Sequence, residues 1–158
     1  MRLALALPLL LAGCITIELP VATDASVPAA EVDPEASVQR ALAEVLREAE
    51  RERVRTQQEN LDALANTAVR ISSDLQAWAL KPAQFGGGAG SFEGATLEKL
   101  GYAAEDGRYQ TIDGAFWLEA SGDAWHVRGE SARFDQGVVA QVSGTDYRDI
   151  ALSVEVRG

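Results

Sequence analysis

From Glu35 to Lys81 the chain contains neither glycine nor proline, and no other feature limits its possible folds as strongly. The stretch follows Asp33-Pro34, where Asp33 can cap a helix and proline suits the first helical position. About 47 helical residues measure roughly 70 Å, more than twice the diameter of a small domain. The sequence therefore predicts one long helix over residues 34–81. The helix is expected to end at Lys81 because a residue that precedes a proline, here Pro82, avoids helical backbone.

Apolar residues on this helix form two separate stripes. The first recurs at steps of four, three and four residues and comprises Val38, Leu42, Val45 and Ala49. The second recurs at alternating steps of three and four and comprises Leu61, Leu64, Ala68, Ile71, Leu75 and Trp78. Such a stripe can be a coiled-coil surface or can pack on the protein's own sheet, and we favour the sheet because strands follow it. Between the stripes, residues 50–60 are polar apart from Val54 and pair their charges at helical spacing. We therefore expect residues 47–60 to form a solvated spacer.

Beyond Arg108 the pattern changes to an alternation of apolar and polar residues, the period of β-strands. Asp113-Gly114 and Gly122-Asp123 separate neighbouring segments and are typical of tight hairpin turns. The last segment alternates so regularly that it predicts a strand with one buried and one wet face. The expected strands are residues 108–112, 115–120, 124–129, 137–143 and 150–157. The predicted fold is α+β: a long N-terminal helix packed on an antiparallel meander sheet of four or five strands, with the β domain in residues 82–158.

A glycine-rich run between Phe85 and Gly90 raises the question of a phosphate-binding loop. Such loops need a preceding strand and a following helix with Lys-Ser/Thr at its start. Here a helix precedes the run and Ser91-Phe92 follows it. We therefore interpret the run as a flexible crossing from helix to sheet.

The first 14 residues combine a positive charge at Met1-Arg2, an apolar run from Leu3 to Leu11, and the tetrapeptide Leu11-Ala12-Gly13-Cys14. This tetrapeptide resembles the lipobox in the signal of bacterial lipoproteins. The resemblance implies that residues 1–13 are a signal peptide and that fatty acyl chains such as palmitate are attached to Cys14. It also implies an exported protein of the cell envelope that lipid holds on a membrane. Ile15 stands where an aspartate commonly marks retention in the inner membrane, which favours the outer membrane if the cell is Gram-negative.

Other interpretations of the N-terminal segment fit less well. A transmembrane helix needs about 20 apolar residues, whereas Glu18 and Pro20 interrupt this apolar run. Type IV pilins also have a cut after glycine and a glutamate at the fifth mature position, here Glu18, but in them a long apolar helix follows the cut. A buried core strand would not usually lie directly behind Met1-Arg2. Residues 14–33 contain two prolines and show neither a helical nor a strand period, so we expect a tether.

Composition and side-chain chemistry argue against several classes of function. The net charge is −10, with 24 acidic and 14 basic residues, which suits neither nucleic acid nor anionic lipid headgroups. If Cys14 carries lipid, no cysteine remains, and the one histidine, His126, lacks the partners of a catalytic triad or zinc site. Aspartates lie near predicted turns, where they usually bond to backbone; they are Asp106, Asp113, Asp123, Asp135, Asp146 and Asp149. We therefore predict no enzyme and no cofactor or metal site.

The arrangement predicted for residues 61–158 resembles the head of pilin-like proteins. Its most distinctive part is the junction from helix to sheet, residues 71–102, which reads ISSDLQAWALKPAQFGGGAGSFEGATLEKLGY and is similar to uncharacterised bacterial pilin-like proteins. The resemblance implies a long helix against a small meander sheet. It carries over no functional residue, and the N-terminus departs from that of true pilins.

Together these features predict a lipid-anchored, exported, non-catalytic protein with a structural or assembly role through protein contacts, including self-association through the helix. The alternative is a cell-envelope binding module that captures a ligand or partner on the sheet face or turn loops. An apolar groove lined by Trp117 and Trp125 would favour the binding module. A helix stripe free of the sheet would favour the assembly role.

Overall fold

The structure is a computed structural model that describes residues 33–156. The predicted signal peptide, Cys14 and the predicted tether up to residue 32 lie outside the described residues. The chain divides into two compact units, residues 1–39 and residues 40–158. Of the first unit only the start of the long helix is described; the second unit contains the remainder of that helix and the whole sheet.

Helix α1 runs from Pro34 to Leu80 and confirms the long helix expected from the stretch without glycine and proline. Asp33 caps its start, since its Oδ1 accepts a hydrogen bond from the backbone N–H of Glu35 at 3.0 Å. Beyond α1 the chain turns through the short 3-10 helix η1 (Ala83–Phe85). Trp78 holds this turn by donating from its indole Nε1 to the carbonyl oxygen of Gly86 at 2.9 Å. The glycine-rich run is thus a crossing around the end of the helix.

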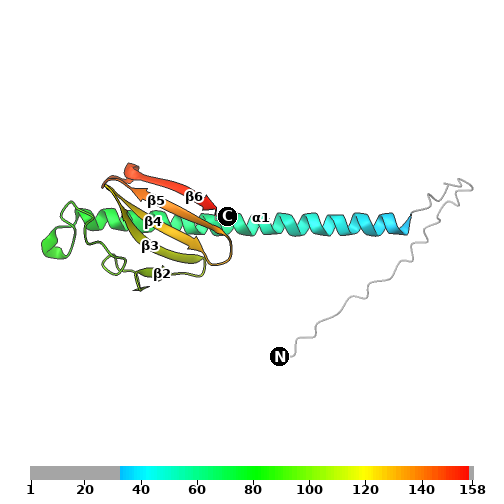
Figure 1. Ribbon diagram of the computed structural model, residues 1–158, viewed down its shortest axis with the longest axis horizontal. Helices are drawn as coiled ribbons and strands as arrows, with labels where there is room; N and C mark the ends of the chain where they lie inside the picture. The colour runs from blue at the N-terminus through cyan, green and yellow to red at the C-terminus, as the bar shows by residue number, and fades with distance from the viewer. Residues whose placement is uncertain (1–32, 157–158) are drawn as a thin grey trace, which may run out of the picture. The chain divides into compact units, whose positions relative to one another are not determined.

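Six strands form one antiparallel sheet in which each strand pairs with its neighbours along the chain (Figure 1). They are β1 (Ala104–Glu105), β2 (Arg108–Gln110), β3 (Gly114–Ser121), β4 (Ala124–Ser131), β5 (Gln136–Val142) and β6 (Ile150–Val156), and the 3-10 helix η2 (Tyr147–Asp149) precedes β6. The predicted meander is confirmed, and the two-residue β1 is the strand that the sequence pattern did not indicate. With α1 packed on one face of the sheet, the fold is α+β in a pilin-like arrangement.

Of two Asp-Gly pairs in the first part of the sheet, only one forms the two-residue turn of a hairpin. Asp106 and Gly107 join β1 to β2 with φ angles of 50° and 72°, the positive values that a type I′ hairpin turn requires. For the next hairpin the sequence predicts a turn at Asp113-Gly114. Instead, a hydrogen bond of 2.8 Å from the N–H of Thr111 to the carbonyl oxygen of Gly114 leaves Ile112 and Asp113 at the tip. The hairpin is confirmed, but its predicted turn residues are wrong because Gly114 is already part of β3.

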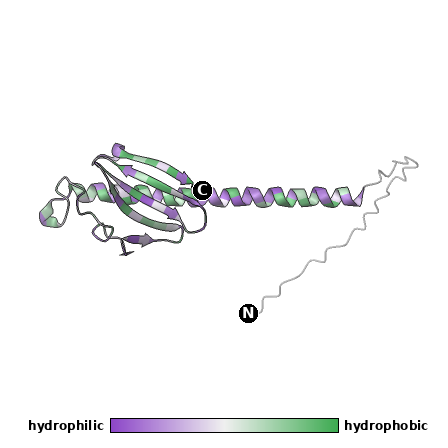
Figure 2. Ribbon diagram, in the orientation of Figure 1, coloured by the Kyte–Doolittle hydropathy of each residue, from purple (hydrophilic) through white to green (hydrophobic). Residues whose placement is uncertain are grey.

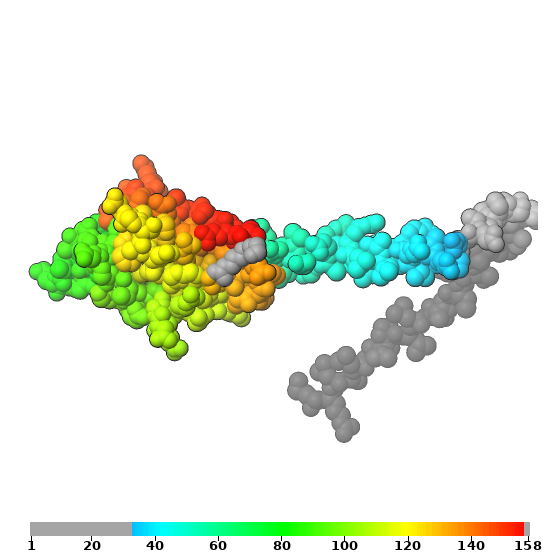
Figure 3. All heavy atoms as spheres, viewed as in Figure 1, coloured from blue at the N-terminus to red at the C-terminus, as the bar shows by residue number. Residues whose placement is uncertain are grey.

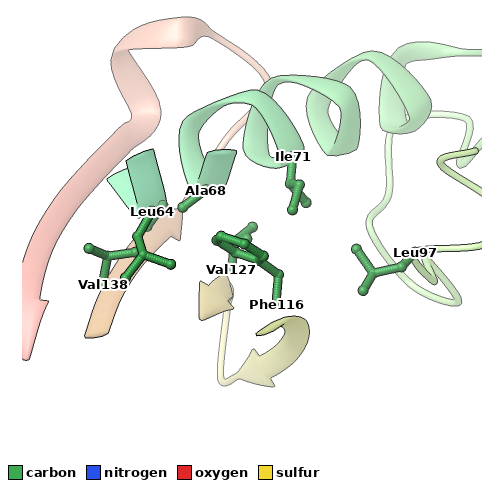
Figure 4. Packing of buried hydrophobic residues seen from close by; sticks show 8 residues of the cluster. Leu64, Ala68, Ile71, Leu97, Phe116, Val127 and Val138 are labelled. Carbon is green, nitrogen blue, oxygen red and sulfur yellow. The ribbon is translucent and has the colours of Figure 1, made fainter. Parts of the chain in front are cut away.

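The core lies between α1 and the sheet face that α1 covers. The exposed fraction is 0% for four residues of the second stripe, Leu64, Ala68, Ile71 and Leu75. Figure 4 shows helix residues of this stripe directed toward Phe116 of β3, Val127 of β4 and Val138 of β5. The second stripe therefore packs on the protein's own sheet, as predicted, and does not form a coiled-coil surface.

Buried amide side chains fix α1 on the sheet at two places. One of them is Asn60, which is 2% exposed, so the prediction of a solvated spacer is wrong at its last residue. Asn60 donates from Nδ2 to the carbonyl oxygen of Asp113 at 3.1 Å, and Gln136 of β5 donates to the carbonyl oxygen of Gln57 at 3.0 Å. Further along α1, Gln76 donates to the carbonyl oxygens of Gly144 and Asp146, between β5 and β6. Because buried polar groups must keep their partners, these bonds determine where along the sheet the helix lies.

Candidate functional site

The histidine considered as a catalytic base lies on the sheet face away from α1. In β4, His126 stands opposite Glu119 of β3 and Gln141 of β5, and side chains paired across strands share a face. Its Nδ1 is buried and has no hydrogen-bond partner among the described residues. A carboxylate beside an imidazole is only part of a triad-type arrangement, which also needs a nucleophile within reach of the base. These two cross-strand neighbours supply no hydroxyl or thiol group.

Several aspartates near turns are engaged in structural contacts. Asp146 and Asp149 form a capping box around η2: Asp146 accepts from the N–H of Arg148, and Asp149 accepts from the N–H of Asp146, both at 3.0 Å. Asp113 forms an ion pair of 3.8 Å with Arg133. Within residues 33–156, no group of three or more histidine, cysteine, aspartate or glutamate side chains is placed to hold a metal ion.

Two shifted pKa values also belong to structural contacts. Burial, followed by the hydrogen bond to Asp74 of α1, raises the pKa of Tyr102 to about 12. On the outer sheet face, the hydrogen bond to Glu119 holds the pKa of Arg128 above its usual value, and Glu155 contributes to the same shift. Arg128 thus connects β3, β4 and β6 across the outer face. Ion-pair networks and docking contacts shift pKa values just as active sites do, so these two shifts do not identify a catalytic site.

The two tryptophans that could line a binding groove lie on opposite faces of the sheet. Trp117 is paired with Arg128 on the outer face, where the guanidinium of Arg108 lies 4.4 Å from its ring centroid. Trp125 packs against the core cluster of α1 and borders an open depression of about 420 Å³. The groove that would favour a binding module is therefore not formed by these residues.

The first apolar stripe of α1 remains exposed. We call the part of this stripe that lies in the second unit, together with the neighbouring Leu46, the free stripe. It comprises Leu42, Val45, Leu46 and Ala49. The side chains of Leu42, Val45 and Leu46 are 58%, 64% and 61% exposed, in contrast to the buried leucines of the second stripe. Figure 2 shows apolar residues interspersed with polar ones along this part of α1. None of the described helices has an apolar stretch long enough to cross a bilayer. The free stripe is thus an amphipathic helix face that no described residue covers.

Strand β6 forms one edge of the sheet and is exposed on both faces. Leu152, Val154 and Val156 are 45%, 55% and 81% exposed, and Figure 3 shows β6 at the molecular surface. The prediction of one buried face for this strand is wrong beyond Ile150, because the core under α1 is built from β3, β4 and β5. Sequence reasoning missed this surface, although the last strand of a meander must lie at an edge.

Comparisons with known proteins return no match. No family model, curated protein or solved structure matches the chain. The likeness to pilin-like heads therefore rests on the arrangement of α1 and the meander alone, and no residue acquires a role by alignment. The candidate functional features are the two exposed surfaces, the free stripe and the edge of β6.

Proposed function

We propose that this chain is a lipid-anchored protein of the bacterial cell envelope with a non-catalytic, structural or assembly role, exercised through self-association of α1. The lipobox resemblance at Leu11 to Cys14 supports the anchor. The free stripe supports the assembly role. Within one helix, leucines at positions 64 and 75 are 0% exposed while Leu42 is 58% exposed, so the two apolar stripes serve different partners. This contrast is the observation that carries the proposal.

A second copy of the chain suits the free stripe in a parallel orientation. Leu42 and Ala49 occupy the a positions of a heptad pattern and Val45 the d position between them, which is the seam of a coiled coil. In a parallel pair, Glu48 at position g faces Arg53 at position e of the neighbouring chain, and these charges attract. Chains anchored near the same end would present their helices in this parallel orientation.

The coiled coil would be short and weak without the anchor. The next d position after Val45 is Glu52, which ends the apolar seam. Helix pairs of so few turns are marginal in water. Confinement to a membrane raises the effective concentration of neighbouring chains and so favours their association. Lipid anchoring and helix pairing therefore support each other in this proposal.

Replacing Cys14 by serine is expected to move the protein from the membrane fraction to the soluble fraction. The change removes the thiol that the lipobox resemblance assigns to lipid attachment, and among residues 33–156 no helix could replace it as a span. Cell fractionation and mass spectrometry of the membrane-extracted wild type provide the measurement. A Cys14→Ser protein that stays in the membrane fraction, or a mature chain that begins elsewhere, would contradict the anchor.

A cysteine at Val45 is expected to form a disulfide-linked dimer in the membrane-bound chain. In a parallel coiled coil, identical d positions face each other across the seam. Cys14 is the only natural cysteine, and lipid would occupy its thiol, so only the introduced thiol reacts. The matched control is Arg47→Cys, which lies outside the seam. Mild oxidation followed by non-reducing electrophoresis measures the dimer, and equal dimer yields from the two variants would contradict pairing through the free stripe.

A further inference from the structure

The unpaired edge of β6 lacks the features that usually keep strand edges apart from other chains. Its seven residues pair with β5 in unbroken register, from Val142↔Ile150 to Gln136↔Val156, whereas β1 at the opposite edge has two residues. Natural edges are commonly protected by proline, lysine or a bulge. Strand β6 contains none of these, and its one charged residue, Glu155, forms an ion pair of 3.0 Å with Arg128 of its own chain.

The backbone groups on this edge belong to the apolar residues of the strand. Next to the register pair Val142↔Ile150, the N–H of Ser143 donates to the carbonyl oxygen of Asp149 at 3.0 Å. Because antiparallel ladders alternate, odd-numbered residues of β6 direct their backbone groups toward β5 and even-numbered residues direct theirs outward. The outward residues are Ile150, Leu152, Val154 and Val156, and within the described chain no strand pairs with them.

These residues share the sheet face that α1 covers elsewhere. In the register, Leu152 and Val154 stand opposite Ala140 and Val138, both buried in the core cluster. Paired residues share a face, so the apolar row of β6 continues the core face to the edge, where it is exposed. An occupant of this edge must therefore be an extended strand with apolar side chains on that same face.

We infer that this occupant is β6 of a second copy, paired antiparallel in the register centred on Ser153. That register pairs all seven residues, with Leu152 opposite Val154 and Ile150 opposite Val156, so each outward residue meets an outward residue. It places Glu155 opposite Ala151 and brings no like charges face to face. Moving the centre to Leu152 would place Asp149 opposite Glu155 and leave Val156 outside the pairing. The repulsion between these carboxylates and the smaller number of paired β6 residues disfavour that register, so the register centred on Ser153 is preferred.

The two-fold axis of this pairing is perpendicular to the sheet, so each copy contributes the same edge and the two α1 helices are antiparallel. The contact differs in surface and orientation from pairing through the free stripe. It does not depend on the proposed function.

Cysteine crosslinking tests the register in the Cys14→Ser chain, which has no other thiol. In the inferred pairing, residue 153 meets itself as a non-hydrogen-bonded pair, with Cα atoms about 4.5 Å apart, within the range that a disulfide spans. Ser153→Cys is therefore expected to give a covalent dimer. The matched control is Ala151→Cys, an exposed residue on the same face that meets residue 155 instead of itself, and it is expected to give only background dimer.

A second variant tests the association itself. Leu152→Lys places a charge among the outward residues and is expected to abolish the dimer in sedimentation and the Ser153→Cys crosslink, while the thermal melt by circular dichroism persists. Equal crosslinking of Ser153→Cys and Ala151→Cys, or a monomer at every concentration, overturns the inference. A dimer that survives Leu152→Lys but dissociates with Val45→Glu assigns association to the helix and also overturns it. The crosslinking comparison holds even if Leu152→Lys impairs folding, because neither cysteine replaces a buried side chain.

Discussion

Replacing Leu75 by alanine is expected to lower the free energy of unfolding by about 2–5 kcal/mol. Leu75 is 0% exposed and belongs to the cluster that contains Trp78 of α1 and Val142 of β5. The truncation removes buried apolar surface and leaves a cavity that helix and sheet can close only in part. Urea unfolding of the purified Cys14→Ser chain, followed by tryptophan fluorescence, measures the loss, and Trp78 reports from within the same cluster.

The matched control is Leu42→Ala, the same chemical change on the same helix. Leu42 is 58% exposed, and leucine and alanine both favour helix, so we expect a change of about 0.5 kcal/mol or less. An unchanged unfolding curve for Leu75→Ala would show that the second stripe is not core. Equal losses for the two variants would show that the free stripe is buried in solution, as self-association at the assay concentration would produce.

The helix and its buried stripe could be predicted because both depend on local sequence. The absence of glycine and proline between Glu35 and Lys81 limits the backbone, and the spacing of Leu64, Ile71 and Leu75 identifies one face. The choice between coiled coil and sheet packing required only the observation that strands follow the helix. In the structure this stripe is the core, and the meander order follows from the tight turns between consecutive strands.

The burial of β6 could not be predicted in this way because it depends on which strands of the sheet α1 covers. The alternation of Leu152 and Val154 with small or polar neighbours has the same form whether the apolar face lies under a helix or beyond it. The width of one helix covers the middle strands and leaves the last strand exposed. Similarly, the sequence indicated the first stripe but could not decide whether another part of the chain covers it.

Among candidate site residues, Cys14 was predicted from a motif and lies outside the described residues, so it remains a prediction.

The expected groove between Trp117 and Trp125 depended on which sheet face each residue occupies. A register shift of one residue exchanges the faces of a strand, and sequence alone did not determine the register of β4 against β3. In the structure Trp125 pairs with Ala120 and Trp117 with Arg128, which places the tryptophans on opposite faces.

Gly114→Ala is expected to lower the free energy of unfolding by about 1–3 kcal/mol through overpacking, for a reason that the Asp-Gly turn pattern does not suggest. Gly114 is not among the glycines with positive φ. A Cβ atom at this position would lie 1.9 Å from the carbonyl oxygen of Glu130 and 2.9 Å from Cδ2 of Leu64. The closer atom belongs to the backbone of β4, which cannot move without distorting the pairing of β3 with β4. Urea unfolding of the purified Cys14→Ser chain measures the loss.

Gly107→Ala separates this steric cost from the cost of a left-handed backbone. Gly107 has a φ of 72° and nothing within 4 Å of its would-be Cβ, so its substitution should cost about 1–2 kcal/mol through backbone strain alone. A double-mutant cycle of Gly114→Ala with Leu64→Ala then identifies the clashing atom. If the carbonyl of Glu130 dominates, trimming Leu64 gives no rescue and the two losses add. A Gly114→Ala chain as stable as the wild type, or one that Leu64→Ala restores, would show that β3 and β4 do not approach as closely as the structure places them.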